Sequence, residues 1–79
     1  MKLTGIVHSG RVDVGSKHEH VGYHIITPDG RRVSLYHLGD NPFENKRLSP
    51  FEGRGVEVVG NFDSKKRDLF VVEEVRQIG

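Results

Sequence analysis

The chain contains no cysteine. Disulfides and thiolate metal sites are therefore excluded, and the fold must be stabilised by packing and hydrogen bonding. No apolar run approaches the roughly 20 residues of a membrane-spanning helix, and the first residues lack the apolar segment of a secretion signal. We therefore expect a cytoplasmic protein that does not associate with a membrane.

An excess of charge of one sign is also lacking. Twelve Lys and Arg residues against eleven Asp and Glu residues give a formal net charge of +1. This balance does not by itself predict a polyanionic partner, so any electropositive surface must be local. The length predicts one domain, residues 1–79, with a thin core, because so short a chain buries only about 60% of the surface that it exposes when unfolded.

Motifs of catalysis are absent as well. Gly53-Arg54-Gly55 precedes a strand-like run rather than a helix, so it does not form a phosphate-binding loop. Glu73 and Glu74 are neighbours on opposite faces of a strand and do not form a facing carboxylate pair. No turn typical of a catalytic nucleophile is present. We expect a protein that is not an enzyme and has no cofactor.

What the chain does contain is a series of β-branched runs separated by glycine and proline. They predict five strands, over residues 2–14, 21–27, 31–38, 53–63 and 69–75. Gly5 and Gly10 interrupt the first run, as at a bulge or a bend that lets one strand serve two halves of a curved sheet. Pro28-Asp29-Gly30 predicts a tight turn between the second and third strands.

A connector separates the third strand from the fourth. Asn41 can cap a helix with Pro42 at its first position, which predicts one short helix near residues 42–51. About two turns would fit over residues 43–48 before Ser49 and Pro50 end it, and the helix is either α or 3₁₀ in character.

Alternation along the strands predicts which side chains face the core. The expected inward residues are Tyr23, Ile25, Val33, Leu35, Val56, Val58, Gly60 and Phe62, and the expected outward residues are His24, Ile26, Arg32, Ser34 and Tyr36. The apolar connector residues expected to close one end are Phe43, Leu48 and Phe51.

The order of three strands, a short helix and two strands resembles the OB-fold, the oligonucleotide- and oligosaccharide-binding superfamily. The matching features are the long first strand with its glycines, the Pro28-Asp29-Gly30 turn, and residues 51–60 leading into the fourth strand. The resemblance implies an all-β fold: a small five-stranded OB-like Greek-key barrel with one short connector helix between strands three and four. It covers nearly the whole chain.

The resemblance also implies a non-catalytic binding module, with single-stranded nucleic acid as the favoured ligand. In OB-folds that bind oligonucleotides, the ligand crosses strands two and three and contacts the loops that join strands one to two and four to five. These loops correspond to residues 15–20 and 63–68. The implied nucleic-acid-binding residues are Lys17, His24, Arg32, Tyr36, Lys65, Lys66 and Arg67.

The alternative is a protein-interaction or assembly module with no nucleic-acid role, which would use an exposed strand edge or the side of Phe70. The near-zero net charge favours this alternative. Phe70 falls on the opposite parity to Leu69 and Val71, so it either packs under a neighbouring loop or lies exposed and marks a partner surface. Packing is the interpretation that we favour.

Three histidines cluster near the first loop. His18, His20 and His24 share one parity in an extended chain, whereas Glu19 lies on the other. Zinc usually needs three or four well-oriented ligands, so we predict no metal site here. The neutral-range titration of histidine also allows a pH response in this loop.

Overall fold

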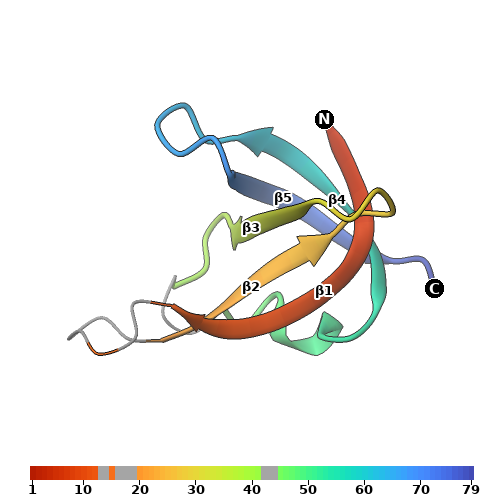
Figure 1. Ribbon diagram of the computed structural model, residues 1–79, viewed down its shortest axis with the longest axis horizontal. Helices are drawn as coiled ribbons and strands as arrows, with labels where there is room; N and C mark the ends of the chain where they lie inside the picture. Colours follow the sequence, from red (N-terminus) through yellow and green to blue (C-terminus); the bar gives the residue numbers. More distant parts are fainter. Residues whose placement is uncertain (13–14, 16–19, 42–44) are drawn as a thin grey trace.

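The computed structural model describes residues 1–12, 15, 20–41 and 45–79 (Figure 1). It is all-β, with five strands and one short 3₁₀ helix. The elements are β1 (Lys2–Val12), β2 (His20–Ile26), β3 (Arg32–His37), the helix η1 (Ser49–Phe51), β4 (Gly55–Phe62) and β5 (Leu69–Gln77). The five predicted strands are thereby confirmed within the described residues, with ends that differ by a few residues. No helix among these residues is long and apolar enough to cross a membrane.

The strands form one closed sheet in the order β1-β2-β3-β5-β4. β1 closes it, because residues 2–6 pair with β4 and residues 6–12 pair with β2, both antiparallel. The change of partner comes where Gly5 lies against the Ile26 carbonyl, so closely that a Cβ at this position would collide with it. The predicted role of the glycine-interrupted first strand in two halves of a curved sheet is confirmed.

The remaining pairings bring β5 between β3 and β4. β3 and β5 are parallel, whereas β4 and β5 are antiparallel with a register shift between Val59 and Gly60. A side chain at Gly60 would collide with the Val71 carbonyl, so this position also requires glycine. The expected turn between β2 and β3 is present, with Gly30 at φ +84° and its N–H donating to the Thr27 carbonyl at 2.9 Å.

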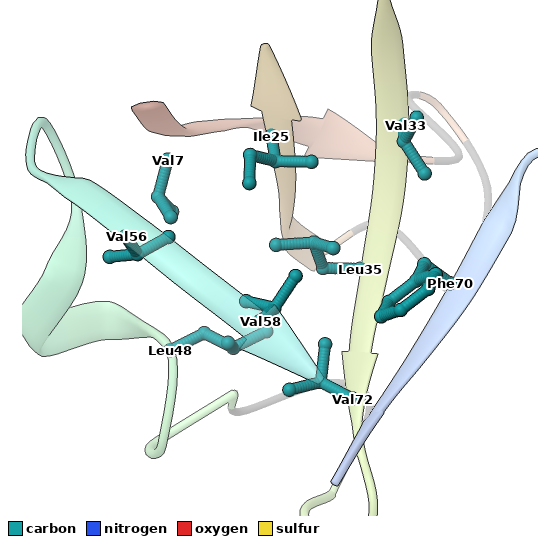
Figure 2. Packing of buried hydrophobic residues seen from close by; sticks show 9 residues of the cluster. All are labelled: Val7, Ile25, Val33, Leu35, Leu48, Val56, Val58, Phe70 and Val72. Atoms are coloured by element: carbon teal, nitrogen blue, oxygen red, sulfur yellow. The ribbon is translucent and has the colours of Figure 1, made fainter. Parts of the chain in front are cut away.

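The core lies inside the closed sheet (Figure 2). Its buried apolar residues are Val7, Ile25, Val33, Leu35, Leu48, Val56, Val58, Phe70 and Val72. Tyr23 and Phe62 pack against this cluster while remaining partly exposed. The predicted inward side chains therefore do face the core.

Phe70 is fully buried, so the favoured interpretation that it is packed is confirmed, but it lies in the core cluster beside the other inward residue Val72 rather than under a neighbouring loop. Its ring meets that of Phe62 edge-to-face, with the centroids 5.2 Å apart. The side of Phe70 therefore offers no surface to a partner.

The connector differs in part from expectation. The short helix between β3 and β4 is present, but it spans only Ser49–Phe51, and Ser49 and Pro50 begin it rather than end an earlier helix. Asn45 has a positive φ of 48°, so no right-handed helix runs through the described residues 45–48, and the predicted helix start at Pro42 lies outside the described residues. Leu48 is fully buried and Phe51 packs against the core, whereas Phe43 lies outside the described residues.

Candidate functional site

One side of the closed sheet, formed by β1, β2 and β3, differs in charge from the rest. The three strands contain no Asp or Glu, whereas β4 contains Glu57 and β5 contains Glu73 and Glu74. We define the outer face as the outward residues, among those whose side chains the structure describes, of β2, of β3 and of the part of β1 that pairs with β2. They are Ile6, His8 and Gly10 on β1, Gly22, His24 and Ile26 on β2, and Arg32, Ser34 and Tyr36 on β3.

A pair of histidines lies at the centre of this outer face. His8 and His24 are cross-strand partners, and their rings stack with centroids 5.8 Å apart and planes inclined by 25°. Partial burial, together with the nearby charges of Arg32 and His8, lowers the pKa of His24 from its ordinary value of 6.5. His24 is therefore a neutral imidazole at neutral pH.

Arg32 brings a cation to the same place. Its Cα pairs with Ile26 on β2, yet its guanidinium crosses to β1, where Nη2 lies 3.9 Å from the position that a Cβ on Gly10 would occupy. Within the described part of the chain, Arg32 forms no ion pair with a carboxylate. Its charge is therefore available to an external anion.

Tyr36 is the third predicted residue of the outer face. It is partly buried, and its hydroxyl donates to the Asp40 carbonyl at 3.0 Å. This hydrogen bond fixes the phenol relative to the segment after β3, so the ring is held in place before any ligand arrives.

The turn between β4 and β5 presents the basic residues Lys65, Lys66 and Arg67, all of them exposed. The Asp63 carboxylate shapes this turn by accepting the backbone N–H groups of Lys66 at 2.8 Å and Lys65 at 2.9 Å. These two hydrogen bonds hold the pKa of Asp63 below its ordinary value. The last residue of this turn contacts β3, because the Ser34 N–H donates to the Asp68 carbonyl at 2.9 Å.

Some predicted positions lie outside the described residues. Lys17 and His18 are among them, and of His20 only the backbone, in β2, is described. Among the residues that the structure does describe, no three His, Asp or Glu side chains form a group able to hold a metal ion.

His8 is a member of the face that sequence reasoning missed. His8 and His24 lie on different predicted strands, so alternation along one strand does not by itself bring them together. The available signal was the antiparallel pairing of two predicted consecutive strands, which places some residue of the first run opposite His24. Which residue of the first run pairs with His24 depends on the strand register, and that register depends on the length of the loop between the two strands.

A concave surface of about 620 Å³ lies on the other side of the sheet, and it is lined by the carboxylates Glu57, Glu73 and Glu74 as well as by cations. Glu57 accepts from Arg76 Nη2 at 2.8 Å and lies 3.3 Å from Lys2 Nζ. These contacts lower the pKa of Glu57. The buried His37 also lines this groove, and its Nδ1–H donates to the Leu38 carbonyl at 2.9 Å. Because three carboxylates line it, this groove is the weaker candidate for binding an anion.

The comparisons with known proteins add no relative from which a site could be transferred. The chain matches no protein-family model, no curated protein and no solved structure. The outer face must therefore be interpreted from its own side chains, whose polar groups are one guanidinium without a carboxylate partner, two stacked imidazoles, one phenol and the Ser34 hydroxyl, next to the apolar Ile6 and Ile26.

Proposed function

We propose that the protein is a non-catalytic, OB-like module that binds single-stranded nucleic acid across the outer face. The observation that carries this proposal is the absence of every carboxylate from β1, β2 and β3, combined with Arg32 beside the His8 and His24 rings. A face with cations and planar rings but no acid suits a ligand with phosphates and bases.

The topology supports the OB-like part of the proposal. β4, β1, β2 and β3 are neighbours in that order and are antiparallel throughout. Three consecutive strands, with a fourth returning by a longer connection to lie beside the first, make the order of a Greek key. The short helix on the connection between β3 and β4 agrees with the same architecture.

Two kinds of force would hold the ligand. The basic turn residues Lys65, Lys66 and Arg67 precede Asp68, whose carbonyl accepts the Ser34 N–H of β3, and they would contact phosphates without reading sequence. Tyr36 and His24 would stack on bases, each at about 1–3 kcal/mol by the usual cost of alanine substitution. Lys17 would add a phosphate contact from the loop between β1 and β2.

Fluorescence anisotropy with a short labelled oligothymidylate at two salt concentrations tests this proposal. We expect replacement of Lys65, Lys66 and Arg67 by alanine to weaken binding and to flatten its dependence on salt, because phosphate contacts release counterions. Tyr36→Ala should weaken binding by about tenfold with a nearly unchanged salt slope, because it removes stacking alone.

Lys2→Ala provides the control for charge removal, since Lys2 lies on the far side of the sheet in contact with Glu57. We expect it to leave the affinity nearly unchanged. Absence of binding by the wild-type protein at low salt would eliminate the nucleic-acid function. The alternative of a protein-interaction module would then lead, although without the Phe70 surface, since that ring is buried.

A further inference from the structure

Gly10 is a glycine that neither its own backbone conformation nor the described residues around it require. Gly5 and Gly60 each lie against a carbonyl that a side chain would strike, and Gly30 has a positive φ. Gly10, by contrast, has no positive φ, and a Cβ there would meet, among the described residues, only Arg32 Nη2 at an ordinary contact distance of 3.9 Å. Glycine within a strand costs roughly 0.5–1 kcal/mol relative to alanine and often marks the close approach of a ligand.

The groups around Gly10 are the polar side chains at the centre of the outer face. Gly10 pairs with Gly22, and the next outward pair along the same two strands is His8 and His24. The Arg32 guanidinium reaches the same spot from β3. A patch of bare backbone is therefore bordered by two stacked imidazoles and by a cation with no carboxylate partner in the described part of the chain.

We propose that Arg32, His8 and His24 form a nucleotide subsite on the β1–β2 half of the outer face, with Gly10 leaving room for the base. The Arg32 guanidinium receives a phosphate, and the adjoining base stacks on the exposed ring of the histidine pair. This inference rests on the proposed function and extends it, because it adds residues of β1 to a binding surface for which Tyr36 and the basic turn were proposed.

The chemistry of the three side chains favours a nucleotide over a simple anion or an apolar segment. A guanidinium binds phosphate through planar, paired N–H groups. Imidazole rings are among the side chains on which unstacked bases stack. An acidic peptide would satisfy Arg32 but would leave the rings and the open glycine without a role.

The test compares Gly10→Val and His8→Ala with Thr4→Val in the same anisotropy assay. Thr4 is exposed on the same strand and at the same parity, but it pairs with Glu57 on β4, away from the outer face. We expect Gly10→Val and His8→Ala to weaken oligothymidylate binding about tenfold, with little change in salt slope, and Thr4→Val to leave binding unchanged. Arg32→Ala should weaken binding and reduce the salt slope by about one phosphate contact.

Two further measurements sharpen the result. Gly10→Val should melt at the same temperature as the wild type or above it, because valine suits a strand and a Cβ at this position meets, among the described residues, only Arg32 Nη2 at 3.9 Å. The imidazole NMR signals of His8 and His24 should shift when the oligothymidylate is added. A lower melting temperature for Gly10→Val would contradict the role of Gly10, and His8→Ala would then decide the subsite alone.

The outcomes separate the inference from the proposed function. If the basic-turn and Tyr36 variants lose affinity while His8→Ala and Gly10→Val bind as the wild type does, the subsite is wrong and the nucleic-acid function stands. If the wild-type protein binds no oligonucleotide at low salt, both are wrong. Loss of affinity in His8→Ala and Gly10→Val, but not in Thr4→Val, supports the subsite.

Discussion

At the scale of the residue, His24 shows how position sets the behaviour of a side chain. It lies in the middle strand of the outer face, between His8 on β1 and Arg32 on β3. Partial burial and the two neighbours all disfavour its protonated form, so its pKa is lowered from 6.5. The unfolded chain has neither the burial nor the fixed neighbours and takes up the proton at the ordinary value.

This difference predicts an acid sensitivity of the fold. Between the lowered pKa of the folded state and 6.5, the unfolded state binds more protons than the folded state. The free energy of unfolding therefore rises with pH across that window and is smaller on its acidic side than on its alkaline side. We expect His24→Gln to lose less stability than the wild type on acidification from about pH 7.5. Urea unfolding at a series of pH values measures this, and Arg32→Gln should reduce the acid sensitivity in part. Identical pH profiles for wild type and His24→Gln would refute the prediction.

At the scale of the element, the β4–β5 hairpin depends on one carboxylate at its turn. Asp63 accepts two successive backbone N–H groups, those of Lys65 and Lys66, as Asp commonly does in turns. The three basic side chains that follow are thereby carried on an ordered backbone rather than on a loose loop. Order of this kind lowers the entropy that a ligand must remove on binding.

We expect Asp63→Ala to loosen this turn while Asp63→Asn keeps it, because an amide oxygen can accept the same two hydrogen bonds. The backbone ¹⁵N heteronuclear NOE of residues 64–67 is the measurement. It should fall in the alanine variant and stay near the wild-type value in the asparagine variant. Equal NOE values in all three proteins would show that the turn is held by other contacts.

At the scale of the whole molecule, the core inside the closed sheet is completed by a side chain that belongs to no strand. Leu48 comes from the connector and is fully buried in the core, beside Val58 and Val72 in the view of Figure 2. A chain of this size has a small core, so each buried side chain contributes a large share of the stability. The connector is therefore part of the core as well as a link between strands.

We expect Leu48→Ala to lower the free energy of unfolding by about 2–5 kcal/mol, the usual range for such truncations in a packed core. Leu38→Ala removes the same atoms from a residue that is 47% exposed, and it should change stability by no more than about 0.5 kcal/mol. Urea denaturation of the three proteins provides the values. A similar loss in both variants would mean that Leu48 does not close the core.

The sequence by itself determined the features that depend on near neighbours. Strict alternation placed Val33 and Leu35 inside and Arg32 and Ser34 outside, because successive strand side chains point to opposite faces. The Pro28-Asp29-Gly30 turn was predictable for the same local reason, since proline and glycine restrict or extend φ wherever they stand. The outward positions of His24, Arg32 and Tyr36 were predicted correctly by the same alternation.

Only the tertiary structure decided the features that depend on register and closure. Alternation set Phe70 apart from Leu69 and Val71 and off the core, because four successive apolar residues do not show which parity faces inward. The pairing of β5 with both β3 and β4 turned Phe70 and Val72 inward. Asn45 is left-handed, and its side chain donates to the Val21 carbonyl at 3.0 Å, a contact between distant segments that the local pattern of the connector does not contain.

The juxtaposition of His8, His24 and Arg32 has the same origin. Each of the three residues was placed on a strand by its local pattern, but the pairing of β1 with β2 and the path of the Arg32 side chain across β2 bring them together. Local sequence preferences act over a few residues, whereas strand register is fixed by the loops and by the joint packing of one core. This juxtaposition is for that reason a property of the closed sheet and not of any single segment.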